Sequence, residues 1–87
     1  MCDQCDPYFK PVPVGADAAF REQHGLIQAA VADDLLEPLD GAPWTDGAPA
    51  PRCFRRTYGC TRCAQLFILE RGGCNAFGDQ WRPLHGN

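Results

Sequence analysis

Two Cys-x-x-Cys pairs constrain this chain more than any other feature of its sequence. Cys2 and Cys5 stand at its start, and Cys60 and Cys63 follow more than fifty residues later. A Cys-x-x-Cys turn points both sulfur atoms to one side while nearby backbone amides hydrogen-bond to them, which suits half of a tetrahedral metal site. Two such turns supply the four thiolates of a closed structural zinc centre. The sequence therefore predicts that one Zn²⁺ joins the two pairs.

The length of the chain gives a physical reason for such an ion. The 87 residues form one domain, and a domain this short buries only roughly 60–65% of the surface that its unfolded chain exposes. The apolar core is therefore expected to be marginal. Zinc binding contributes roughly 10–16 kcal/mol in small zinc peptides, which is ample to close a long loop because closure entropy rises only slowly with length.

Composition favours metal ligation over disulfides for the six cysteines. No segment approaches the roughly 18–20 apolar residues of a membrane span, and the start lacks the pattern of a secretory signal. We therefore expect a cytoplasmic protein, in which thiols stay reduced. A signal removed by processing keeps disulfides open as an alternative, and a rubredoxin-like iron site is another. A thioredoxin-type redox role is not expected, since neither pair lies between a strand and a helix.

The middle of the chain predicts a helical insert over residues 15–38. Asp17 is the expected N-cap, and apolar residues then follow at spacings of seven, four and four, along one helix face. These residues are Phe20, Ile27, Val31 and Leu35. Gly25 either ends a first short helix after His24 or is tolerated at about 1 kcal/mol. Pro38 ends the helical pattern.

The second half of the chain changes to a period of two, which predicts β-strands. Strands over residues 53–58 and 66–70 are expected to flank the second cysteine pair as a hairpin, and residues 76–84 to return as a third strand or an ordered tail. The predicted fold class is therefore α+β, a small antiparallel sheet with one or two short helices between the cysteine pairs. The single domain, residues 1–87, divides into the first cysteine turn (1–10), the helical insert (15–38), a Pro/Gly loop (39–51) and the hairpin region (52–84).

The other cysteines and the histidines are expected to have ordinary structural roles. Cys53 is interpreted as a small buried residue in a strand and Cys74 as a turn thiol, although either could replace Cys2 as a terminal ligand. His24 and His85 are interpreted as polar surface residues, although both could also ligate.

Charge is divided unevenly along the chain. Residues 1–50 carry nine acids and two cations, a net −7, whereas residues 51–87 carry six arginines and two acids, a net +4. One Zn²⁺ with four thiolates would lower the total charge of −3 by a further two. A polyanion is therefore not expected as the general partner, although the second half could form a local basic face.

Three functions agree with these features. The first is a metal-stabilised module that binds another protein through an acidic surface, with the contact residues Asp33, Asp34, Glu37, Asp40, Trp44 and Asp46. Trp44 alternatively anchors its loop to the core, which is the commoner use of a tryptophan. The second is a nucleic-acid or transcription-associated adaptor that uses Arg52, Arg55, Arg56 and Arg62, with Tyr58 or Phe54 for stacking. The third is an iron or redox carrier.

An enzyme is not expected. No carboxylate dyad, Gly-rich phosphate loop or Ser-His-Asp set stands out in the sequence. A Cys–His nucleophilic pair stays open at this stage, as does the choice between zinc and iron.

The motif Gly59-Cys60-x-x-Cys63-x-x-x-Phe67 resembles the hairpin half of a zinc ribbon. The chain departs from the usual zinc-ribbon pattern in having Asp6 and Ala64, rather than glycine, after the second cysteine of each pair, and in the long insert between the pairs. More narrowly, residues 58–70 and 78–84 resemble the C-terminal half of small bacterial zinc-ribbon proteins encoded beside secreted toxins. That resemblance implies a cytoplasmic immunity protein that binds and neutralises a cognate toxin.

Overall fold

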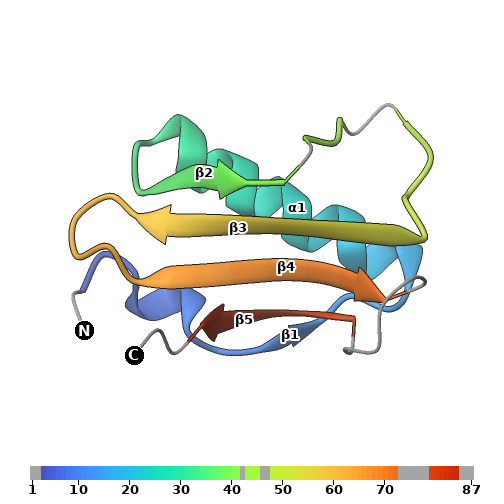
Figure 1. The fold of residues 1–87 in the computed structure, drawn as a ribbon, viewed down its shortest axis with the longest axis horizontal. Helices are drawn as coiled ribbons and strands as arrows, with labels where there is room; N and C mark the ends of the chain where they lie inside the picture. The colour runs from blue at the N-terminus through green and yellow to red at the C-terminus, as the bar shows by residue number, and fades with distance from the viewer. Residues whose placement is uncertain (1–2, 42, 46–47, 73–78, 85–87) are drawn as a thin grey trace.

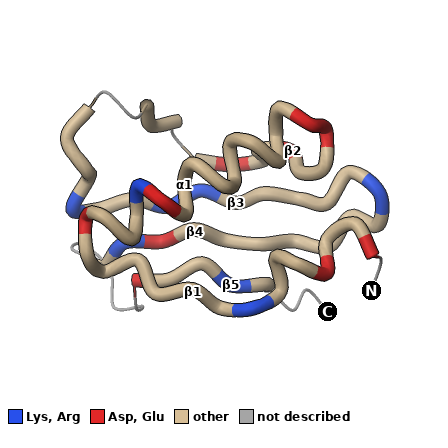
Figure 2. Tube along the Cα trace, turned by 180° about the vertical axis from the view of Figure 1, so that it is seen from behind, with Lys and Arg blue, Asp and Glu red and all other residues tan. Residues whose placement is uncertain are grey.

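A computed structural model of the chain describes residues 3–41, 43–45, 48–72 and 79–84. Over these ranges the fold is α+β, as the sequence predicts, and one α-helix packs against a five-stranded antiparallel sheet. The elements in chain order are η1 (Asp6–Tyr8), β1 (Val12–Pro13), α1 (Asp17–Ala32), β2 (Leu36–Asp40), β3 (Cys53–Cys60), β4 (Leu66–Gly72) and β5 (Gln80–Leu84). The strand order is β1-β5-β4-β3-β2. Helix α1 crosses one face of the sheet, behind the strands in Figure 1 and in front of them in Figure 2.

The helical insert is a single helix that tolerates Gly25 in its interior. Ala16, rather than Asp17, is the N-cap, and Asp17 lies in the first turn. Phe20 and Ile27 are fully buried against the sheet, which confirms the first half of the predicted apolar face, whereas Val31 is half-buried and Leu35 lies beyond the end of the helix.

Helix α1 ends earlier than predicted because the chain takes a left-handed turn at Asp34, where φ is 60°. The backbone N–H groups of Asp34 and Leu35 donate to the carbonyl oxygens of Val31 (3.1 Å) and Ala30 (2.8 Å). This pair of bonds is the Schellman arrangement, in which one left-handed residue closes the helix. Aspartate is among the few residues besides glycine that adopt this conformation readily.

The segment after this turn is a strand, so the expectation of a helical insert to residue 38 is wrong. Strand β2 pairs antiparallel with β3, with Leu36 opposite Cys60 and Pro38 opposite Tyr58. Pro38 has no N–H to donate, and it is accommodated because β2 lies at the edge of the sheet. The Pro/Gly loop consequently begins after residue 40 rather than at residue 39.

The predicted hairpin is present, and the third strand is present as β5 within its predicted range of 76–84, of which residues 76–78 lie outside the described part of the chain. Strands β3 and β4 pair from Cys53 opposite Gly72 to Gly59 opposite Leu66, and β5 adds to β4. Trp81 of β5 is fully buried and stacks on Phe67, with 5.2 Å between the ring centroids.

A second aromatic cluster lies between the first half of α1 and the loop before β3. The rings of Phe20, Trp44 and Phe54 pack edge to face around Phe20, and Trp44 Nε1 donates to the Pro49 carbonyl at 3.0 Å. Trp44 is 9% exposed, which confirms that it anchors its loop.

His24 belongs to this cluster, so its interpretation as a surface residue is wrong. Its ring lies 4.8 Å from that of Trp44, and the side chain is 1% exposed. The reason is helical spacing, because position 24 is four residues after Phe20 and three before Ile27, on the same helix face.

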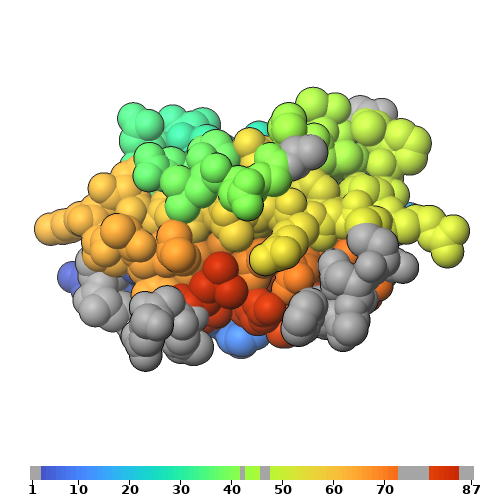
Figure 3. Space-filling model, in the orientation of Figure 1, coloured from blue at the N-terminus to red at the C-terminus, as the bar shows by residue number. Residues whose placement is uncertain are grey.

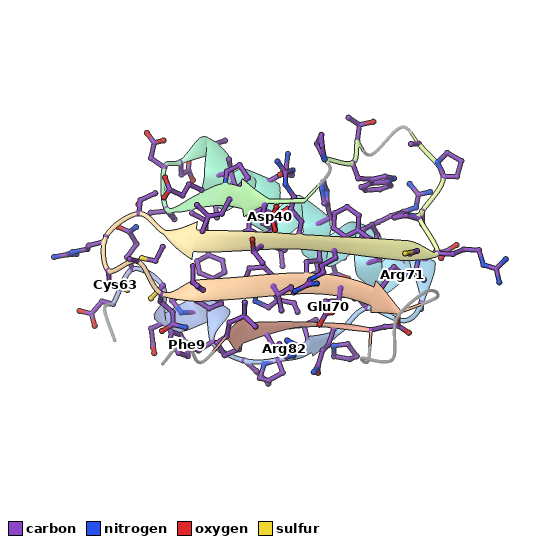
Figure 4. The ribbon with its side chains drawn as sticks, viewed as in Figure 1. Phe9, Asp40, Cys63, Glu70, Arg71 and Arg82 are labelled. Atoms are coloured by element: carbon purple, nitrogen blue, oxygen red, sulfur yellow. The ribbon has the colours of Figure 1, made fainter. Side chains whose placement is uncertain are left out.

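Arg71 is a buried cation that the sequence did not single out. Its guanidinium donates to the carbonyl oxygens of Pro51 (2.9 Å) and Gly15 (2.7 Å) and lies 3.0 Å from the Asp17 carboxylate. It thereby ties the start of α1 to the sheet, at the end opposite Cys63 (Figure 4). Nothing in the sequence signalled this role, because all three partners of Arg71 are at least 20 residues away in the chain.

The buried phenol of Tyr58 predicts a loss of stability in alkali. Burial raises the pKa of Tyr58 above its usual 10.0, an effect that the charge of nearby Arg56 partly opposes. Below about pH 10 the phenol is neutral in folded and unfolded chains alike, so it contributes no pH dependence. Above that pH the unfolded chain ionises first, so the free energy of unfolding falls as pH rises toward the folded-state pKa. Urea unfolding at pH 7 and about pH 11 is expected to show a smaller alkaline loss for Tyr58→Phe than for the unmodified protein, and equal losses would contradict this origin.

Candidate metal centre

Three cysteine sulfurs from distant parts of the chain converge at one end of the sheet. The Sγ atoms of Cys5, Cys60 and Cys63 all lie within 4.8 Å of one another, and those of Cys5 and Cys63 are 3.5 Å apart. Cys5 immediately precedes η1, Cys60 ends β3, and Cys63 lies in the turn that leads to β4. Figure 4 shows Cys63 in this turn, beside the N-terminal segment. Cys2, the fourth predicted ligand, lies outside the described residues.

The turn between β3 and β4 has the hydrogen bonds expected of a metal-binding turn. The backbone N–H of Arg62 donates to Cys60 Sγ at 3.4 Å, and that of Ala64 donates to the Cys60 carbonyl at 3.0 Å. Amide donors to sulfur stabilise the thiolate form that a metal requires. Ala64 has a φ of 64°, the left-handed conformation that glycine adopts without penalty. The turn therefore keeps this shape although alanine occupies the position.

Replacing Ala64 with glycine is expected to stabilise the protein by about 0.5–1 kcal/mol. The left-handed conformation costs alanine roughly 1–2 kcal/mol, and the greater freedom of glycine in the unfolded chain offsets part of the gain. The urea midpoint should rise without a change in metal content. Ala29→Gly, at an exposed position within α1, is the matched control and should lose about 1 kcal/mol. A fall in the midpoint for Ala64→Gly would contradict the prediction.

Polar contacts hold the first cysteine segment against the second. Gln4 Nε2 lies 2.8 Å from Thr61 Oγ1, 3.0 Å from the Leu35 carbonyl and 3.7 Å from Cys60 Sγ. Thr61 Oγ1 in turn donates to the Asp34 carbonyl at 2.5 Å. The α1–β2 turn, the N-terminal segment and the β3–β4 turn are therefore bonded together around the sulfur cluster. Nothing in the sequence marked Gln4 or Thr61 for this role, beyond their places inside the two Cys-x-x-Cys pairs.

The cluster can bind a metal ion. Thiolates at this separation repel one another unless a cation lies between them, and thiolate ligands suit zinc, iron or copper(I) rather than magnesium or calcium. Two of the three thiols are shielded, since Cys5 and Cys60 are 0% and 2% exposed, whereas Cys63 is exposed.

Cys53 is neither a buried thiol nor a candidate ligand, so both interpretations of it are wrong. It is exposed and disulfide-bonded, and it starts the eight-residue strand that Cys60 ends. The two residues are therefore about 23 Å apart at roughly 3.3 Å per residue. The partner of the disulfide lies outside the described residues, as do Cys74 and His85. Disulfides are rare in the cytosol, so the predicted cytoplasmic location stays a prediction.

The predicted protein-contact residues separate into an exposed acidic group and a buried anchor. Asp33, Asp34, Glu37 and Asp40 are exposed along the end of α1, the following turn and β2; we call these four residues the acidic edge. Figure 2 shows acidic residues on the α1–β2 turn and on β2. Trp44 offers little surface to a partner because it packs in the core, and Asp46 lies outside the described residues.

The stacking surface expected of a nucleic-acid adaptor is absent from β3. Tyr58 is fully buried and Phe54 is 7% exposed, so the expectation that either ring stacks on a base is wrong. The Arg56 guanidinium lies over the Tyr58 ring, 5.6 Å from its centroid. Arg52, Arg55 and Arg62 remain exposed.

No protein-family model, curated protein or solved structure matches this chain significantly. No helix in the described ranges has both the length and the apolar character to cross a membrane.

Proposed function

We propose that the protein is a zinc-stabilised binding module in which the metal has a structural role. The observation that carries the proposal is the convergence of Cys5, Cys60 and Cys63 within 4.8 Å. Cys2 is the proposed fourth ligand, because it completes a Cys-x-x-Cys pair with Cys5, and four thiolates leave no open position for water. Bound Zn²⁺ supplies cross-linking between the start of the chain and the β3–β4 turn.

Elemental analysis and cobalt substitution test the metal centre. One zinc per chain is expected, and Co²⁺ in its place should give the visible absorption of a tetrahedral thiolate site. A red protein as purified would show iron and would support the redox-carrier alternative instead. A chain purified without metal that gives no cobalt spectrum would reject the centre.

The partner that we propose is another protein, with a cognate bacterial toxin as its specific form. The acidic edge supports this proposal, because its four carboxylates are exposed on adjoining elements within a half of the chain that carries a net −7. A surface of this kind favours a basic partner and speeds the association of oppositely charged proteins. The resemblance of residues 58–70 and 78–84 to toxin immunity proteins is the reason for proposing a toxin as the partner.

Charge reversal at the acidic edge tests this surface. Asp33→Lys, Glu37→Lys and Asp40→Lys are each expected to slow association with the purified partner, and their combination to weaken binding by about tenfold or more at low salt. Asp34 is left unchanged because its left-handed conformation closes α1. Glu22→Lys is the matched control, since Glu22 is also exposed on α1 but lies outside the acidic edge. Equal binding by the combined variant and the control would reject the acidic edge as the contact surface. Capture of the product of an adjacent toxin gene would identify the partner class.

A further inference from the structure

A pocket of about 440 Å³ is lined by residues of α1, η1 and β1 and by Trp81 of β5. Figure 2 shows the course of these elements from the side on which α1 lies in front of the sheet. Its volume is within the roughly 300–1,000 Å³ usual for ligand sites. Its walls are mainly apolar and include Tyr8, Val12, Leu26 and Trp81. Trp81 Nε1 donates to the Tyr8 carbonyl at 2.8 Å, so the indole has its polar atom satisfied. Leu26 is 56% exposed, which makes it the most exposed large apolar side chain in the described part of the chain.

Gln23 gives this apolar pocket a specific polar group. Its side chain lines the pocket and is 6% exposed, yet no described residue hydrogen-bonds to its amide. The amide atoms are not among the buried side-chain polar atoms that lack a partner, so they keep contact with solvent in the pocket, and a ligand that pairs with the amide takes the place of this solvent. The amide offers both a donor and an acceptor, which matches the N–H and C=O groups of a peptide.

Two charged residues at the pocket favour a particular orientation of a charged ligand. Lys10 lies in the N-terminal wall and Asp33 at the end of α1, and neither is ion-paired with another described residue. Asp33 belongs to the acidic edge, so the pocket adjoins the surface proposed to contact the partner. A cationic ligand group is favoured beside Asp33 and disfavoured beside Lys10.

We infer that this pocket receives a large apolar side chain of the partner protein, whose peptide group bonds to Gln23 and whose neighbouring basic residue pairs with Asp33. This inference rests on the proposed protein-binding function and states what the partner must carry. Interfaces commonly depend on one large anchor residue in a desolvated pocket surrounded by weaker polar contacts. A second pocket, of about 320 Å³, is lined by Pro11, Arg82, Pro83 and Leu84 and so has no acidic residue among the described residues of its lining. Figure 3 shows the face of the sheet opposite α1.

Blocked dipeptides provide the direct test. The metal-loaded, nitrogen-15-labelled full chain is titrated with N-acetyl-leucyl-arginine amide and, separately, with N-acetyl-arginyl-leucine amide, and the shifts of its N–H resonances are followed. The Gln23 side-chain amide, the Trp81 indole N–H and the Ala29 backbone N–H are expected to shift. The Trp44 indole N–H, which lies in the other aromatic cluster, should not. Whichever of these two dipeptides binds more tightly should bind about fivefold or more tightly than two controls. N-acetyl-leucyl-glutamate amide reverses the charge, and N-acetyl-alanyl-arginine amide removes the large apolar side chain, so the two controls separate these contributions.

Three substitutions locate the binding. Ala29→Trp fills the pocket from an exposed helix position and should weaken dipeptide binding about tenfold or more. Gln23→Leu should weaken it about fivefold without loss of thermal stability, because leucine is similar in size and the amide makes no hydrogen bond to a described residue. Gln28→Leu, at an exposed helix position outside the pocket lining, is the control and should change nothing. The inference would be overturned if Ala29→Trp left dipeptide binding unaltered, or if the resonance shifts were confined to other residues. It would also be overturned if free indole bound as tightly as the tighter dipeptide, which would show a small-molecule site.

The dipeptide titration is separable from the test of the acidic edge because it needs no partner. If Glu37→Lys and Asp40→Lys leave partner binding intact while the dipeptides still bind at Gln23, the acidic edge fails and the pocket stands. If those variants weaken partner binding but no dipeptide shifts Gln23 or Trp81, only the pocket fails.

Discussion

Cys60→Ser is expected to abolish metal binding and to lower the free energy of unfolding by about 5 kcal/mol or more. Cys60 is buried, and its sulfur accepts hydrogen bonds from both Gln4 Nε2 and the Arg62 N–H. A small domain has only about 5–15 kcal/mol of stability in total, so most of the variant should be unfolded at 37 °C. Elemental analysis and thermal unfolding followed by circular dichroism measure both effects. A chelator that removes zinc from the unmodified protein should produce the same change.

Arg62→Ala is the matched control for this experiment. Its side chain is exposed between the two cysteines of the second pair, whereas its backbone N–H, which bonds to the Cys60 sulfur, is retained. The variant should keep its metal and its melting temperature. If Cys60→Ser has the same melting temperature as Arg62→Ala, the sulfur cluster does not stabilise the fold, and the structural role proposed for the metal is wrong.

Trp81→Ala is expected to cost about 3–5 kcal/mol, the range for removing a large aromatic side chain from a core. Trp81 is fully buried, stacks on Phe67 and packs against Tyr58 with 5.8 Å between ring centroids. Its indole N–H also ties η1 to β5 through the Tyr8 carbonyl. Urea unfolding should therefore show a large fall in midpoint, even when zinc is saturating.

Trp81→Phe separates packing from the hydrogen bond. Phenylalanine keeps much of the apolar surface but leaves the Tyr8 carbonyl without this donor, so a smaller loss than for alanine is expected, of which about 0.5–1.5 kcal/mol comes from the bond. Equal losses for the two variants would show that the hydrogen bond, rather than aromatic packing, dominates at this position.

The two strands of the hairpin and the first half of the buried helix face were predicted correctly from local pattern. Alternation along residues 53–58 and 66–70 matches β3 and β4, and the apolar spacing from Phe20 to Ile27 matches the buried face of α1. Both patterns repeat within a few residues, at the 2.0 and 3.6 periods set by backbone geometry. The end of α1 was missed because Leu35 and Leu36 continue a helical spacing, whereas Pro38 and the left-handed Asp34 determine the actual path of the chain.

The candidate site divides in a similar way. The two Cys-x-x-Cys pairs identified Cys5, Cys60 and Cys63, because the chemistry of a thiolate centre restricts both residue type and spacing. Gln4 was missed because a glutamine has no distinctive spacing, and its bonds to Leu35 and Thr61 cross long stretches of chain. The pocket beside Gln23 was missed for the same reason, since its walls come from α1, η1, β1 and β5.

By itself, the sequence determined the fold class, the hairpin and the residues able to ligate a metal, because each depends on residue types at short, regular spacing. Only the tertiary structure decided that Leu36–Asp40 is an edge strand, that His24 and Arg71 are buried, and that Gln23 faces an apolar pocket. These features depend on which segments meet in space, and the free energy of such contacts belongs to pairs of residues far apart in the chain rather than to any local pattern.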